Sequence, residues 1–202
     1  MRRIAYVVGR GMVAAAVAMG AWAGAAVAAE QYAIDASHST IGFSVPHMMI
    51  SRVHGAFNEV DGTIAYDEAD PANSAVSVTI KAASIDTRHD KRDAHLRNED
   101  FFDVEKFPEI TFQSTRIERD GEGYAAVGHL TLHGVTKEVR LPFRVLGTIQ
   151  DPRGKTRLGI EAETVLNRRD YGILWNKAMD NGGGVIGDEV KVLLTLEAVH
   201  TP

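Results

Sequence analysis

The sequence predicts an all-β protein in which eight antiparallel strands close into a lipocalin-like, up-and-down barrel. Three observations favour this fold: apolar and polar residues alternate along most of the chain, short turn signals join the alternating segments, and only two segments break the rhythm. An alternating strand has one apolar and one polar face. Closure into a barrel removes the exposed edges that an open sheet would leave. A two-sheet sandwich of the same strands is the alternative.

Residues 1–28 predict a secretory signal peptide. A basic start precedes an Ala-rich apolar run that closes in small residues, which is typical of an export signal. The Ala26-x-Ala28 pattern predicts cleavage after Ala28, with Ala29 as the other choice. Residues 29–202 then form one domain, expected in the periplasm, with no further apolar stretch long enough to span a bilayer.

Composition excludes several classes of function. The chain has no cysteine, which excludes disulfides, thiol nucleophiles and sulfur ligands for a metal. Its net charge is −5, and the signal peptide holds three of the 22 basic residues and none of the 27 acidic ones, so the exported chain is more acidic still. An acidic chain without a basic tract is not expected to bind nucleic acid through phosphate contacts.

The strands are expected where the alternation is clear, and turn signals separate them. Alternation marks residues 41–45, 55–66, 76–82, 110–112, 124–132, 139–145, 158–162 and 190–196. His133-Gly134 predicts a two-residue hairpin turn with positive φ at both positions. Further turn signals lie at residues 68–73, 118–123 and 150–155.

Four of the residues expected to point inward are small. They are Ala82, Ala126, Gly128 and Ala162. Such residues leave room for a slender ligand, or they relieve crowding where strands bend. The sequence alone leaves both interpretations open.

Two segments lack the alternation. Residues 166–187 are expected to form a long loop that ends in a glycine run, and residues 89–106 one or two short helices. In a helix Arg92 and Leu96 are i, i+4 neighbours, so a charged face and an apolar edge coexist. We expect Arg92, Asp93 and His95 to form a polar cluster that fixes this helix, rather than to perform acid–base chemistry.

The pattern of histidines and carboxylates does not favour catalysis. The eight histidines do not show the spacing of a zinc site, since His89 and His95 do not share a helix face and His129 and His133 are expected to face solvent. No G-x-S-x-G motif is present. We therefore expect no catalytic residue, no metal and no cofactor. The alternatives are a metal-assisted hydrolase or isomerase that uses the histidines, and a stress-responsive structural barrel with a filled core.

Several ordered motifs resemble one family. They are IDASHSTIGFSVPHMM, GAFNEVDGTI, the stretch HDKRDAHLRNEDFF with the FPEITF that follows it, GHLTLHGVTKEVRLPF and a final block from Asn167 to Val190. Together they resemble the YceI-like polyisoprenoid-binding proteins, a lipocalin-like group of exported bacterial proteins, from about Tyr32 to Ala198. Two positions depart from the pattern, because Val60 replaces a more usual aromatic residue and His133 replaces Asn.

The resemblance implies a barrel around an apolar tunnel for a long isoprenoid or fatty-acyl chain, no enzymatic activity, and a possible homodimer. We expect the tunnel wall to include Ile41, Phe43, Val45, Phe57, Val78, Ile80, Phe112, Leu130, Phe143, Leu194 and Leu196. We expect the barrel ends to include Leu96, Phe101, Phe102, Tyr171, Ile173 and Trp175. A long chain is favoured because burial yields about 0.8 kcal/mol per CH₂, and association costs about 4–15 kcal/mol.

Overall fold

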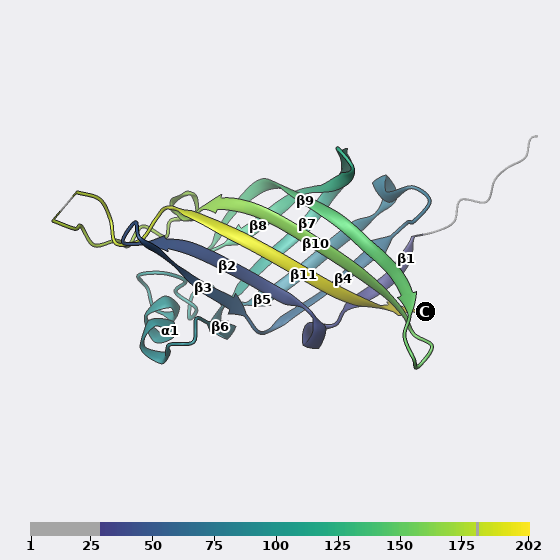
Figure 1. Cartoon of the computed structure of the whole chain (residues 1–202), viewed down its shortest axis with the longest axis horizontal. Coiled ribbons are helices and arrows are strands. Elements are labelled where there is room, and N and C mark those ends of the chain that lie inside the picture. Colours follow the sequence, from purple (N-terminus) through teal and green to yellow (C-terminus); the bar gives the residue numbers. More distant parts are fainter. Residues whose placement is uncertain (1–28, 181) are drawn as a thin grey trace, which may run out of the picture.

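The protein forms a long antiparallel barrel with one short helix at its side (Figure 1). This computed structural model describes residues 29–180 and 182–202; the expected signal peptide, residues 1–28, lies outside the described residues. The strands are β1 (Glu30–Ile34), β2 (Thr40–His47), β3 (Ser51–Phe57), β4 (Val60–Tyr66), β5 (Ala75–Lys81), β6 (Ile85–Asp86), β7 (Glu109–Asp120), β8 (Gly123–Leu132), β9 (Val135–Gln150), β10 (Thr156–Asn167) and β11 (Glu189–Thr201).

Eight of the strands close a ring. Their order is β1-β4-β5-β7-β8-β9-β10-β11, and β11 pairs with β1 to complete it. Every paired neighbour runs antiparallel, and from β7 onward each strand pairs with the next in sequence, as in an up-and-down barrel. The predicted eight-stranded fold is therefore confirmed, and the sandwich alternative is wrong.

The remaining strands, β2, β3 and β6, extend the wall beyond the ring. The free edge of β11 is shared, because its residues 198–201 pair with β1 while its residues 191–195 pair with β2. The segment 55–66, expected as one strand, holds the end of β3 and all of β4. The chain turns between them at Asn58 and Glu59, whose N–H groups donate to the backbone oxygen and hydroxyl of Ser84.

The turns and one glycine follow from backbone sterics. His133 and Gly134 connect β8 to β9 with φ of 50° and 73°, as the two-residue turn requires. Gly128 faces a bulge in β7, where a Cβ would lie 2.2 Å from the Gln113 carbonyl oxygen. At this position the small residue relieves crowding between two strands.

Among the described residues there is one α-helix, α1 (Asp90–Arg97), and it lies in the segment expected to be helical. The His89 side chain caps it by accepting a hydrogen bond from the Arg92 N–H. Short 3-10 turns lie at Ala36–His38, Pro71–Asn73, Ala82–Ser84 and Arg168–Tyr171. Figure 1 shows α1 beside β6, at the end of the barrel from which the loop 172–188 projects. Within the described residues, no helix is long and apolar enough to cross a bilayer.

Candidate binding cavity

The barrel encloses a cavity of about 450 Å³. This volume falls within the roughly 300–1,000 Å³ of small-molecule sites. Side chains from the inner faces of the strands form its wall, and nearly all are aliphatic or aromatic. Tyr32, Ile34, Leu158 and Ala198, where β1, β10 and the C-terminal part of β11 meet, belong to the buried core and do not line the cavity. The lining reaches from α1 and the long loop at one end to Tyr66 and Ala75, beside the start of β1.

Most of the apolar residues singled out from the sequence line this cavity. From the strands these are Ile41, Phe43, Val45, Phe57, Val78, Ile80, Phe112, Leu130, Phe143, Leu194 and Leu196, and from the helix and the long loop Leu96, Phe101, Phe102, Ile173 and Trp175. Ala126 and Ala162 also line it, whereas Ala82 and Gly128 do not. Other strand residues of the wall, such as Ile64, Leu141 and Val192, were not among those singled out.

Tyr171 does not line the cavity. It is 2% exposed and packs in the core cluster behind the wall, together with Ile110 and Leu132. Its backbone oxygen lies 2.9 Å from His133 Nδ1. Tyr171 ends a 3-10 turn, where strand alternation no longer gives the direction of a side chain.

Two residues of α1, Arg92 and Asp93, form hydrogen bonds with Thr87. The Asp93 carboxylate is buried and accepts from the Thr87 N–H, 2.9 Å away, and from the Thr87 hydroxyl. Arg92 donates through Nε to the Thr87 hydroxyl at 2.7 Å and through Nη2 to the Thr87 carbonyl at 2.8 Å. Burial would raise the pKa of Asp93, but hydrogen bonds from Thr87 and the His89 backbone, together with the charge of Arg97, hold that pKa below its usual range. The cluster links α1 to the end of β6.

His95 makes a different set of contacts. Its Nε2 lies 2.8 Å from Asp100 Oδ2, and its ring packs edge-on against Phe101 and Trp175, with centroids 5.0 and 4.9 Å away. His95 therefore connects α1 to the turn that follows it and to the long loop. Thr87, Arg92 and His95 all line the cavity, and they add polar groups to its wall on the side of α1.

Two arginines organise this end of the barrel and were given no role from the sequence. Arg97 donates from α1 to the carbonyl oxygens of Ala83 and Ile85. Arg168 is 5% exposed, and burial lowers its pKa. Its guanidinium donates to the carbonyl oxygens of Ile173, Trp175 and Gly187 and to Asp188 Oδ1, at 2.8 to 3.0 Å. These contacts join an arginine side chain to groups five to twenty residues away and follow no helix or strand period, so spacing along the chain gave no signal for them.

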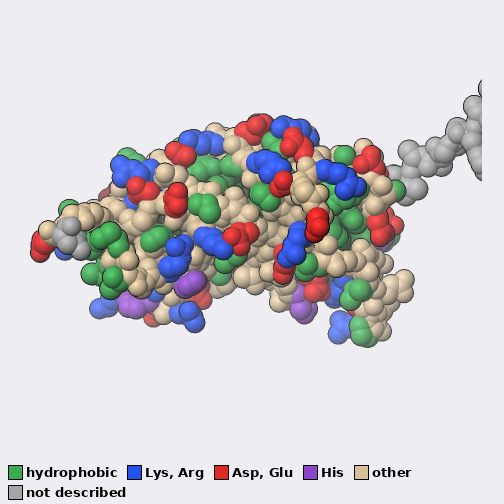
Figure 2. Space-filling model, turned by 45° about the horizontal axis from the view of Figure 1, so that its top comes forward, with side chains coloured by type: hydrophobic (Ala, Val, Ile, Leu, Met, Phe, Trp, Pro, Cys, Tyr) green, Lys and Arg blue, Asp and Glu red, His purple; other side chains and the backbone are tan. Residues whose placement is uncertain are grey.

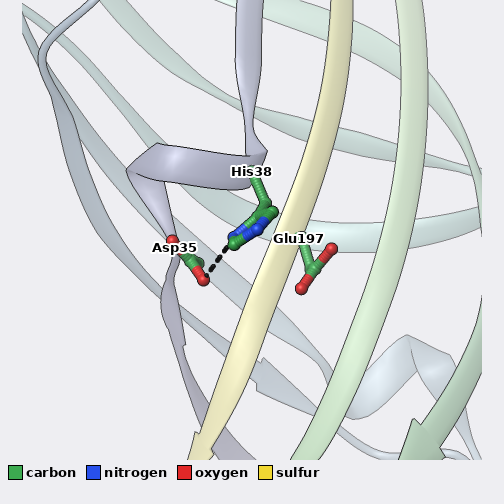
Figure 3. Close-up of side chains that lie close together, drawn as sticks. All are labelled: Asp35, His38 and Glu197. Carbon is green, nitrogen blue, oxygen red and sulfur yellow. Dashed lines mark hydrogen bonds and ion pairs between the residues drawn. The ribbon is translucent and has the colours of Figure 1, made fainter. Parts of the chain in front are cut away.

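Away from the cavity, the side chains of Asp35, His38 and Glu197 lie close together (Figure 3). Within the described residues, this is the group whose composition would suit a metal ion. His38 Nδ1 lies 2.9 Å from Asp35 Oδ2. The Arg157 guanidinium is ion-paired with the carboxylates of Asp35, Glu197 and Asp151. Hydrogen bonds from Ser37, Arg157 and His38 lower the pKa of Asp35. Because Arg157 already pairs with these carboxylates, the group forms an ion-pair network that joins the end of β1 to β10 and β11.

Comparisons with known proteins place the chain in a family. Residues 32–198 match the YceI-like domain. A UPF0312 protein of Pectobacterium atrosepticum is 40% identical over 92% of this chain and 94% of its own. BcnA of Burkholderia cenocepacia has the same fold, with a TM-score of 0.72, 22% identity, and coverage of 81% of this chain and 98% of its own. So does a polyisoprenoid binding domain from Saccharophagus degradans, with a TM-score of 0.59, 17% identity, and coverage of 84% and 98%. The chain belongs to the YceI-like domain family.

Proposed function

We propose that the protein is an exported carrier that holds the chain of a long isoprenoid, or of a similar lipid, inside the barrel. The observation that carries this proposal is the cavity of about 450 Å³ with an almost wholly apolar wall. A barrel with a filled core would have no such space. The Saccharophagus domain of the same fold is described as polyisoprenoid-binding, which supports an isoprenoid as the ligand.

The apolar wall favours a long chain because burial is its main source of affinity. Each buried CH₂ contributes about 0.8 kcal/mol, so ten carbons supply roughly 8 kcal/mol, which an association cost of about 4–15 kcal/mol can cancel. A chain of about twenty carbons exceeds that cost. The ligand that this wall selects is therefore a long, flexible hydrocarbon chain rather than a compact polar molecule.

The polar groups of the wall orient the ligand. Arg92 and His95 line the cavity beside α1, whereas the wall farther along the strands is mostly aliphatic and aromatic. A polar lipid head is therefore favoured near α1, with the hydrocarbon tail extending along the barrel. Nothing in this arrangement calls for a chemical step, so the proposal is binding and transport without catalysis.

A series of ligands of increasing length tests the proposal. Protein freed of lipid is incubated with prenyl alcohols or isoprenoid quinones that differ only in tail length, and Kd is measured by native mass spectrometry. The affinity should rise about fourfold for each CH₂ that enters the cavity and level off when the cavity is full. An affinity that does not depend on tail length, or no binding at any length, would contradict the proposal.

The exported location is tested separately. Cell fractionation followed by sequencing of the mature N-terminus should find the protein in the periplasm, beginning at Ala29 or at Glu30. Protein that retains residues 1–28 and fractionates with the cytosol would contradict this part.

A further inference from the structure

The turn between β2 and β3 exposes three large apolar residues in succession. Met48, Met49 and Ile50 are 44%, 65% and 87% exposed, and we call them the apolar tip. Figure 1 shows this turn and the loop 172–188 projecting together from one end of the barrel, and Figure 2 shows hydrophobic side chains gathered at that end. Contiguous apolar surface of this kind marks interaction sites on soluble proteins.

The backbone of the apolar tip is unfavourable for its residues. Met48 and Met49 have φ of 52° and 61°, in the left-handed region where Asn and Gly fit with less strain. The turn therefore places two exposed methionines where a polar residue would suit both the backbone and the solvent. Such an arrangement lowers stability, and it is explained if the side chains themselves have a binding role.

The apolar tip is continuous with the cavity. Pro46 and His47, which precede it, and Val185 and Ile186, in the long loop, all line the cavity. The Met48 N–H donates to the Val185 carbonyl at 2.8 Å, so the tip and the loop are tied together. The tip therefore adjoins the part of the cavity wall that these four residues form.

The segments that contain the tip and the long loop differ in charge from the chain as a whole. The segments 46–52 and 174–187 carry two basic residues, Arg52 and Lys177, and one acidic residue, Asp180, whereas the whole chain has a net charge of −5. Local positive charge beside exposed apolar side chains suits the phosphate and hydrocarbon layers of a membrane surface. Methionine also adapts to irregular apolar surroundings because its side chain is flexible.

We propose that the apolar tip inserts into the surface of a lipid bilayer, so that a lipid passes between the membrane and the cavity without crossing water. This inference rests on the proposed function, because it concerns how the ligand reaches the cavity. The occupant of the tip is the membrane itself, rather than a second protein.

The test compares two double variants. In Met49→Asn with Ile50→Ser, the tip loses apolar surface, and Asn accepts the backbone of position 49 at least as well as Met. The matched control is Leu146→Ser with Ile149→Ser, which removes two residues that are 56% and 66% exposed on β9, near the opposite end of the barrel. Each protein is floated with vesicles of phosphatidylethanolamine and phosphatidylglycerol, and prenyl lipid uptake is measured from vesicles and from detergent micelles.

The tip variant should bind vesicles about tenfold less than the unaltered protein and take up lipid from them more slowly, at an unchanged melting temperature. Its uptake from micelles should not change, and the control should match the unaltered protein throughout. If the tip variant binds vesicles as well as the unaltered protein, or if the control loses vesicle binding equally, the inference is overturned. Uptake of lipid from micelles would still support the carrier function in that case. The inference would also be overturned if the unaltered protein does not bind vesicles but forms a dimer that dissociates in the tip variant. Failure of the unaltered protein to take up lipid even from micelles would overturn the proposed function.

Discussion

Val78→Trp tests the cavity most sharply. Val78 lies on β5 between Gly62 and Phe112, is 9% exposed and lines the cavity. An indole at this position projects into the space that the ligand chain would occupy. If it displaces about five methylene groups at about 0.8 kcal/mol each, the binding free energy weakens by about 4 kcal/mol, or roughly a thousandfold in Kd.

The fold should survive this substitution. Overpacking a core costs about 1–3 kcal/mol, which corresponds to a fall in melting temperature of roughly 2–12 °C for a domain of this size. The β-type circular dichroism spectrum should not change. The matched control is Val165→Trp on β10, where the side chain is 55% exposed on the outer surface, and it should bind lipid like the unaltered protein. Equal affinity of the Val78→Trp and Val165→Trp proteins for a long prenyl chain would refute the reasoning.

Three further predictions concern the polar contacts. Asp93→Ala leaves the N–H and hydroxyl of Thr87 without their carboxylate acceptor, which costs about 2–4 kcal/mol and should lower the melting temperature by roughly 5–15 °C. The control is Asp90→Ala, which removes an exposed acid from the first turn of α1. An equal fall in melting temperature in both variants would contradict the role of the buried contact. Arg168→Lys keeps the charge, but the lysine side chain cannot reach all four acceptors. Amide hydrogen exchange in the long loop should therefore accelerate by about tenfold or more while the overall fold is kept. Unchanged exchange rates would show that the loop is stable without these hydrogen bonds. Arg157→Gln should lower the free energy of unfolding at neutral pH, and the difference from the unaltered protein should shrink as pH falls below about 4. The reason is that the lowered pKa of Asp35 stabilises the folded state only while that carboxyl is ionised. Acid titrations monitored by circular dichroism measure this difference, and a difference independent of pH would argue against the ion-pair network.

Much of the barrel follows from local sequence. The alternation of apolar residues predicted most of the strands, though not β1, which closes the ring, and His133-Gly134 predicted the turn between β8 and β9. Pairing around the ring was harder to predict, because it depends on contacts between distant residues. Thus the segment with Ile41 was expected in the ring, but it lies in β2, which pairs with β11 outside the closed part of the sheet.

The interior could be predicted less completely than the strands. Alternation identifies which side chains point inward, but whether they leave a space depends on how closely opposite walls approach. Small residues show this limit, since Ala126 lines the cavity while Gly128 relieves a close backbone contact. Tyr171 lies behind the wall, and the Arg168 guanidinium is buried among its acceptors. Both positions depend on the 3-10 turn and the loop, where no periodic pattern exists.

The most direct test of the account is to identify what the barrel holds when the protein is purified from its native envelope. Lipid extraction and mass spectrometry should find about one long-chain isoprenoid or acyl species per protein, and Val78→Trp should lose it. Protein that is free of lipid when isolated, and that also takes up no prenyl lipid or isoprenoid quinone afterwards, would contradict the carrier function.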